Sequence, residues 1–156
     1  MVSKAEALAE LDAGYAKFRA PIADLDDAAF GETWLGSWNL SQCLAHMAGW
    51  YREMTAAIDR VAAGDPPVPA GTDYNDTETW NAKFAALAKP GREALADWES
   101  AYTGYREAAG TLPEDLYGFD AEKQRPLIGN RLLQGAGIGH FEEHQPELER
   151  WLATRK

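Results

Sequence analysis

The sequence predicts an all-α protein, a four-helix bundle, and three observations lead to this prediction. Apolar residues recur at steps of three or four along four long segments, which is the periodicity of one face of a helix. Apolar and polar residues alternate nowhere over a useful length, so no convincing strand is expected. Breaker residues separate the segments, most clearly in the string GDPPVPAG at 64–71. Four amphipathic helices bury their apolar faces most simply against one another.

The first helix is predicted from Ser3, because Ser3 and Glu6 have the spacing of a capping box. Its apolar pattern runs from Leu8 to Leu25, and Pro21 predicts a kink or an end within it. The segment 26–38 contains two glycines and is interpreted as a connector.

The second helix is the best marked. Asn39 is a good N-cap with Gln42 three residues later, and the helix is expected to run to about Ala63. One broad face is apolar from Leu40 to Val61, which predicts a core helix.

The third main helix is preceded by an extra short helix. Apolar residues from Trp80 to Leu87 predict the short one, Lys89-Pro90-Gly91 interrupts the pattern, and Leu95 to Leu112 continue it. The stretch 113–129 is interpreted as a loop.

The last helix is expected from about Asn130. Its inward stripe contains Leu133, Gly137, His140, His144, Leu148 and Trp151. Gly135, Gly137 and Gly139 each cost about 1 kcal/mol relative to Ala in a helix, so they predict close helix approach or room beside a site.

Composition bounds the classes of function. The chain has 156 residues, a net charge of −10 and 46% hydrophobic residues, which indicates one globular domain over residues 1–156. The negative charge argues against binding nucleic acid or anionic membranes. No apolar run reaches the roughly 18 residues of a membrane span, and Cys43 has no partner for an internal disulfide. We therefore expect a cytoplasmic protein in a reducing compartment.

The three histidines are the most informative residues. His140 and His144 are four apart on one predicted helix, so both side chains lie on the same inward face and can reach one divalent ion. His46 lies at the margin of the apolar face of the second helix, where antiparallel packing can bring it to the pair. Three nitrogen donors would leave coordination positions open and suit Zn, Ni or Fe. Equally, these histidines can be buried polar residues bonded to Glu143 and Glu147.

Other residues are candidates for binding or catalysis. Trp50, Trp80 and Trp151, with Trp38, can line an apolar substrate cleft, although each can equally be ordinary core. Asn75 can orient a ligand or cap the helix beside it.

Two glutamates and the cysteine are candidates for chemistry. Glu53, two turns from His46, and Glu143 can act as a general base, although most glutamates on helix surfaces do not. Cys43 can be a nucleophile near a metal, but a lone Cys on an apolar stripe is usually packing.

Two strings resemble a known family. GSWNLSQCLAHMAGWYREM, which contains His46, and GHFEEHQPELERWL, which begins at Gly139, are similar to the second and last helices of the DinB-like superfamily, especially its ClbS/DfsB branch. YNDTETWNAKF, from Tyr74 to Phe84, is similar to the third segment of that branch.

The resemblance implies a four-helix bundle, often a homodimer, with a divalent metal held by His46, His140 and His144. It also implies activity toward small electrophiles, as in thiol-dependent transferases or isomerases and in self-resistance proteins.

The sequence thus leads to a functional hypothesis with an alternative. The hypothesis is detoxification of a small reactive molecule by hydrolytic opening or thiol addition, with Glu53 or Glu143 managing protons. The alternative is a protein that binds or sequesters a small molecule in the same cleft without turnover, and a groove for a partner helix is a third interpretation.

Overall fold

The structure, a computed structural model, describes residues 2–155 and confirms the predicted helical bundle. Its helices are α1 (Lys4–Arg19), α2 (Asp27–Phe30), α3 (Leu40–Ala62), α4 (Thr77–Ala85), α5 (Arg92–Thr111), α6 (Ile128–Leu133) and α7 (Gly139–Thr154), with a 3-10 turn η1 (Glu114–Leu116) and a π-helical segment η2 (Gln134–Ile138). Its strands are β1 (Thr33–Leu35), β2 (Trp38–Asn39), β3 (Phe119–Asp120) and β4 (Arg125–Pro126).

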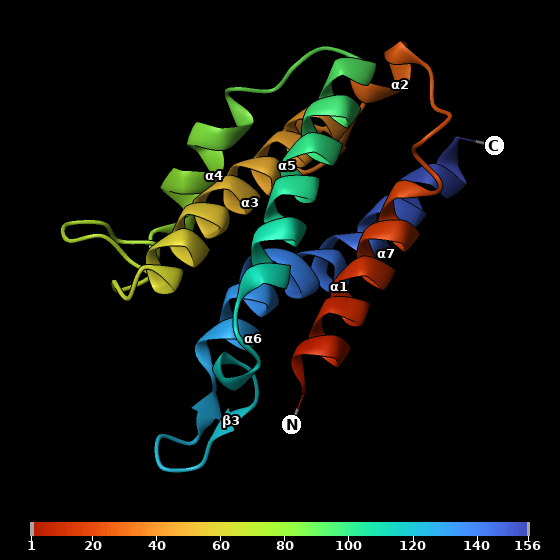
Figure 1. The fold of residues 1–156 in the computed structure, drawn as a ribbon. Coiled ribbons are helices and arrows are strands. Elements are labelled where there is room, and N and C mark those ends of the chain that lie inside the picture. The colour runs from red at the N-terminus through yellow and green to blue at the C-terminus, as the bar shows by residue number, and fades with distance from the viewer. Residues whose placement is uncertain (1, 156) are drawn as a thin grey trace.

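The long helices form two neighbouring layers (Figure 1). Helices α3 and α5 pack along each other, and α4 covers the outer side of α3. Helices α1 and α7 lie side by side, with the two chain termini at opposite ends of this pair. The β3–β4 hairpin projects beyond α6 at one end of the bundle. The short helix predicted before the third main helix is α4.

The two predicted capping boxes are present and fix the starts of α1 and α3. The Ser3 hydroxyl accepts from the backbone N–H of Glu6, and the Asn39 side chain accepts from that of Gln42. In turn, the backbone N–H groups of Ser3 and Asn39 donate to the side-chain oxygens of Glu6 and Gln42. Helix α1 ends at Arg19, so the proline at position 21 follows the helix and does not kink it.

The connectors contain more structure than the sequence predicted. The segment 26–38 forms α2, capped by the Asp26 side chain, and the antiparallel β1–β2 pair. The loop 113–129 contains η1 and the antiparallel β3–β4 pair. Each paired segment is only two or three residues long, which is too short for an alternating pattern to be visible.

Two expectations around α4 were wrong. Asp76, not Asn75, caps this helix, because the Asp76 side chain accepts from the backbone N–H of Thr79. Leu87 lies beyond the end of α4 and is 71% exposed, so it does not extend the apolar face.

The last helix begins at Ile128 and widens into one π turn before α7. In that turn the N–H of Gly139 bonds to the carbonyl of Gln134, five residues back. The predicted close approach occurs at Gly137, where a Cβ would lie 2.5 Å from Leu11 Cδ1 and 3.1 Å from the Tyr105 hydroxyl. Helix α1 and α5 therefore pack directly on the backbone of η2.

A main core of large side chains fills the space between the layers. Trp98, Tyr51, Tyr105 and Phe18 are among its fully buried members. The Tyr105 hydroxyl donates to the carbonyl of Leu132 at 2.6 Å, which satisfies a buried polar group. Within residues 2–155, no helix combines the length and apolarity that crossing a bilayer requires.

Candidate metal centre

Three histidines from two distant segments of the chain converge between α3 and α7. The ring centroids of His46 lie 5.1 Å from those of both His140 and His144, and the latter two are 5.6 Å apart. One nitrogen of each ring can be chosen so that the three atoms all lie within 4.8 Å of one another. The convergence predicted from helical spacing is therefore present in the structure.

Backbone carbonyls orient two of the three rings. His46 Nδ1 bonds to the carbonyl of Cys43 in the preceding turn of α3, and His140 Nδ1 bonds to the carbonyl of Ala136, in η2, at 3.1 Å. Because a carbonyl only accepts, each Nδ1 carries the proton and the lone pair lies on Nε2. This pattern of a second bond that fixes the ring is typical of metal-binding histidines.

The third ring, His144, lacks such a partner. It is buried, and its Nδ1 has no hydrogen-bond partner. The Glu147 carboxylate oxygen Oε1 lies 3.6 Å from this nitrogen, beyond normal hydrogen-bond distance. A buried nitrogen without a hydrogen-bond partner is energetically costly, and binding of a ligand to this atom would remove that cost.

Burial keeps two of the imidazoles neutral. Burial, followed by the neighbouring histidines, lowers the pKa of His46 well below its ordinary value. The same causes, burial first, lower the pKa of His140 to about 4. At neutral pH both rings are therefore unprotonated, which is the state that binds a metal ion.

The donor set fits a divalent transition metal. Neutral imidazole nitrogens are ligands for Zn, Ni and Fe, and three protein ligands leave room for a further one, as in catalytic sites. Among the described residues, these three histidines form the cluster of His, Cys, Asp and Glu side chains close enough to share an ion.

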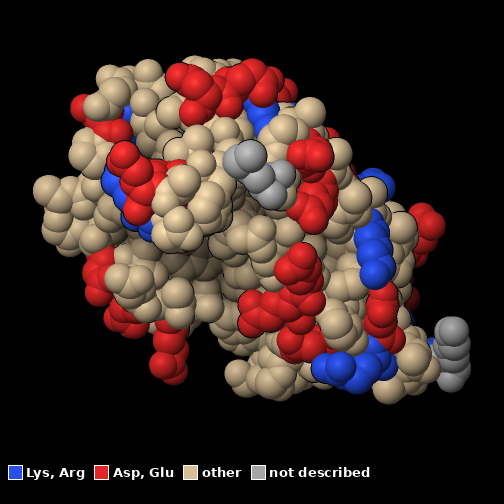
Figure 2. All heavy atoms as spheres, turned by 90° about the horizontal axis from the view of Figure 1, so that it is seen from below, with Lys and Arg blue, Asp and Glu red and all other residues tan. Residues whose placement is uncertain are grey.

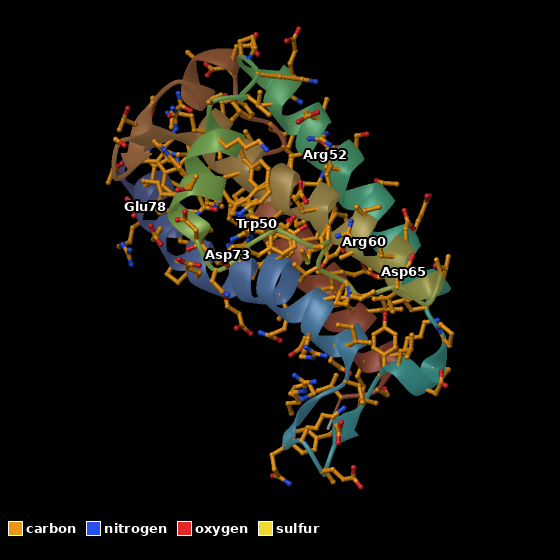
Figure 3. All side chains as sticks on the ribbon, turned by 90° about the vertical axis from the view of Figure 1, so that its left-hand side faces the viewer. Trp50, Arg52, Arg60, Asp65, Asp73 and Glu78 are labelled. Atoms are coloured by element: carbon orange, nitrogen blue, oxygen red, sulfur yellow. The ribbon has the colours of Figure 1, made fainter. Side chains whose placement is uncertain are left out.

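A cleft of about 380 Å³ opens beside His140. Its walls come from α3, α4, the preceding loop, η2 and α7, and the lining residues are Trp50, Met54, Tyr74, Thr77, Asn81, Gly135, Ala136, His140 and Glu143. Figure 3 faces this side of the molecule, with Trp50 near its centre and Arg60 and Asp65 toward one end of α3. The cleft thus connects one imidazole of the cluster with solvent.

Hydrogen bonds hold the aromatic wall of the cleft in place. The Trp50 indole N–H donates to Asn81 Oδ1 at 2.7 Å, and the Tyr74 hydroxyl donates to Glu53 Oε2 at 2.8 Å. The Trp80 indole N–H donates to the carbonyl of Asp73 at 2.8 Å, which ties the loop before α4 to that helix.

The structure brings some of the predicted site residues together. Trp50 and Glu143 line the cleft with His140. Trp80 packs against Trp50 with ring centroids 6.0 Å apart, behind the cleft wall. Glu53 does not line the cleft, but it accepts a hydrogen bond from the hydroxyl of Tyr74, which does.

Other predicted residues lie elsewhere. Asn75 is exposed and outside the cleft lining. Trp151 stacks on Trp34 with ring centroids 5.1 Å apart, and it lines a different hollow of the surface. The Cys43 thiol is fully buried, and burial raises its pKa, so it stays protonated and is packing rather than a nucleophile.

Two features of the site were missed by the sequence prediction. Tyr74 forms part of the cleft wall, although it was not predicted as a site residue; it begins the string YNDTETWNAKF, which carries the family resemblance. The π segment supplies the Ala136 carbonyl that orients His140, and the three closely spaced glycines were its only trace in the sequence.

Trp38, whose ring centroid lies 4.9 Å from that of His46, covers the cluster on another side.

Comparison with known proteins gives a family match over much of the chain. Residues 11–117 match the family described as the mycothiol maleylpyruvate isomerase N-terminal domain. A comparison with curated protein sequences finds no match.

Solved structures of the same fold include three whose names bear on function. The chain superposes on the sibling lethal factor precursor DfsB with a TM-score of 0.81 at 16% identity, covering 100% of this chain and 98% of that one. The colibactin self-resistance protein ClbS, in complex with double-stranded DNA, gives 0.77 at 13% identity over 96% and 95% of the two chains. The mycothiol-dependent maleylpyruvate isomerase gives 0.69 at 18% identity over 94% of this chain and 61% of that one.

Proposed function

The chain belongs to the mycothiol maleylpyruvate isomerase N-terminal domain family of the DinB-like superfamily, and from this premise we propose that it is a metal-dependent enzyme acting on small electrophiles. Its ligands for one divalent ion would be His46, His140 and His144. The reaction class is addition of a thiol to an electrophilic carbon, or hydrolytic opening at one. The family name, which includes a thiol-dependent isomerase, supports the thiol reaction.

One observation carries this proposal: His140 belongs both to the three-nitrogen cluster and to the wall of the aromatic cleft. A molecule seated in the cleft therefore lies beside the ring that would hold the ion. A divalent ion held by three imidazoles supplies Lewis-acid chemistry at such a position.

The residues of the cleft provide the other functions that such a reaction needs. Trp50 and Tyr74 meet edge to face, with ring centroids 5.7 Å apart, and together form an aromatic wall against which a planar molecule can pack. Addition of a thiol to an activated C=C bond forms a C–S bond, breaks the C=C π bond and ends with the thiol proton on the neighbouring carbon. Glu143 is the carboxylate on the cleft wall that can take this proton from the thiol and return it to that carbon. Glu53, bonded to the Tyr74 hydroxyl, would act as a positioning residue for that ring.

The test is turnover by untagged protein loaded with Zn or Ni. The protein is incubated with a small-molecule thiol and a panel of electrophiles, and the products are identified by mass spectrometry. We expect thiol adducts or hydrolysed products above the uncatalysed rate, lost in the double variant His140→Ala/His144→Ala. The matched control is Cys43→Ala, which removes the one protein thiol and should retain turnover.

Other outcomes would overturn the proposal. Turnover by the His140→Ala/His144→Ala variant at the wild-type rate would show that the histidine cluster takes no part in the reaction. A ligand that binds and returns unchanged from metal-loaded protein would instead support sequestration in the same cleft. The proposal includes a cytoplasmic location, where a reduced small-molecule thiol is available.

A further inference from the structure

The charged residues around the cleft determine which molecules it binds. This inference rests on the proposed function and adds the class of ligand. Among the described residues that line the cleft, Glu143 bears a negative charge and none is Lys or Arg. A second carboxylate, Glu53, lies one hydrogen bond behind the wall, at the Tyr74 hydroxyl. An anion entering the cleft would therefore meet the like charge of Glu143.

Two cationic side chains, Arg60 and Lys83, lie behind the aromatic wall and not in the cleft lining. The Arg60 guanidinium donates to the carbonyl of Pro67 through Nε at 3.0 Å and through Nη2 at 2.7 Å. Lys83 Nζ lies over the Trp80 ring, 4.8 Å from its centroid, and Lys83 is exposed and is not part of the lining. Burial, followed by the bond to Glu53, raises the pKa of Tyr74, and Arg60 lies close enough to the Tyr74 hydroxyl to oppose this rise, so its charge offsets that of Glu53 behind the wall. Glu143 is then the charged residue on the cleft wall itself.

Asn81 adds a directional preference. Its Oδ1 is occupied by the indole N–H of Trp50, and because an indole nitrogen only donates, the amide orientation is fixed. Asn81 therefore keeps its Nδ2 donors for a ligand, and Asn81 lines the cleft. A hydrogen-bond acceptor, such as a carbonyl oxygen, is the complementary group on the ligand.

We propose that the cleft is specific for planar, uncharged organic molecules that carry a carbonyl acceptor, and that it discriminates against carboxylates. Trp50 and Tyr74 bind the planar part, Asn81 donates to the carbonyl, and Glu143 repels anions. The ligand class that the walls of the metal-free cleft favour is a neutral conjugated carbonyl compound.

The test compares cinnamamide with cinnamate, which share a planar conjugated skeleton and differ in charge. Dissociation constants are measured at low ionic strength by NMR titration, with the Trp50 indole N–H signal reporting the location. The measurement uses metal-stripped protein, because a bound ion can attract a carboxylate by itself. We expect cinnamamide to bind about fivefold more tightly than cinnamate, the upper end of the effect of a partly exposed charge.

Two pairs of variants isolate the residues. Glu143→Gln should narrow the preference to less than about twofold, whereas Glu142→Gln, which removes the same charge from a residue lining a separate groove, should preserve it. Asn81→Asp keeps an acceptor for Trp50 but removes the Nδ2 donors, so it should weaken cinnamamide about fivefold or more. Asn75→Asp adds the same charge at an exposed position outside the cleft and should leave binding unchanged.

Cinnamate binding as tightly as cinnamamide, or a preference unaltered by Glu143→Gln, would overturn the proposal, as would binding that leaves the Trp50 signal unmoved. These outcomes are independent of the metal. A protein that binds no ion but prefers cinnamamide would overturn the proposed function and leave the specificity intact.

Discussion

Acid should destabilise the metal-free protein through its buried histidines, and His140 gives the size of the effect. The pKa of this imidazole falls from 6.5 to about 4 in the folded protein, because of burial and the neighbouring His144. Between these two pH values the unfolded chain binds more protons than the folded one. The contribution of His140 to stability is therefore fully present above about pH 6.5 and is lost as the pH falls toward 4.

The lowered pKa of His140 corresponds to a change of about 3 kcal/mol in the free energy of unfolding when the pH falls from above 6.5 to below 4. About 2.5 kcal/mol of this change has occurred at pH 4.5. The assay is urea unfolding at pH 7.5 and pH 4.5 with a metal chelator present, on wild type and on His140→Gln. Glutamine has no proton to gain, so the variant should lose about 2.5 kcal/mol less stability between the two pH values. Carboxylates titrate in the same range but do so in both proteins and cancel in the difference. An equal pH dependence in the two proteins would refute a buried, neutral His140.

Three further predictions concern packing, reactivity and nucleic acid. Gly137→Ala should lower the free energy of unfolding by about 1–3 kcal/mol, because the new Cβ would lie 2.5 Å from Leu11 Cδ1. Gly135→Ala should be neutral or stabilising, because a Cβ there has no such neighbour within 4 Å. Chemical denaturation of the two variants distinguishes these outcomes. The Cys43 thiol should react with a disulfide reagent only as fast as the protein unfolds, because it is buried and its pKa is raised; rapid labelling of native protein would contradict this. Double-stranded DNA should show no mobility shift with this protein at about 150 mM salt, although the structural neighbour ClbS forms a DNA complex. The reason is the net charge of −10, and acidic side chains outnumber basic ones on the face in Figure 2. A salt-dependent mobility shift would contradict this prediction.

The ends of the long helices could be predicted because the signals that set them are local. Ser3 and Asn39 each find their partner within three residues, so the capping boxes are visible in the sequence and present in the structure. The short strands were missed because two or three residues are too few to show an alternating pattern. The close packing of the π turn could not be predicted because Leu11 and Tyr105, which approach the backbone of Gly137, are distant in sequence.

The histidine cluster could be predicted in part. Spacing places His140 and His144 on one inward face, and bundle packing then brings the margin of the second helix, with His46, toward them. The cleft could not be predicted to the same degree. The bond of Tyr74 to Glu53 depends on the path of a loop that no periodicity describes.

Trp151 illustrates the limit of periodicity. It lies on the same helical stripe as His144, as predicted, but the β1 strand supplies Trp34 to stack on it and it is thereby held away from the cleft. Helical spacing gives the face on which a side chain lies, and not which neighbour covers it.

X-ray absorption spectroscopy at the metal edge shows whether His46, His140 and His144 bind one ion together. Untagged protein loaded with Zn should hold about one equivalent, with three imidazole nitrogens at about 2.0–2.1 Å. Replacing any one histidine by Ala should remove one of these nitrogens from the spectrum and weaken binding by about 100-fold or more, given about 10–16 kcal/mol shared among four ligands. A protein that retains no Zn, or a spectrum unchanged by all three substitutions, would show that the three histidines do not hold a common ion.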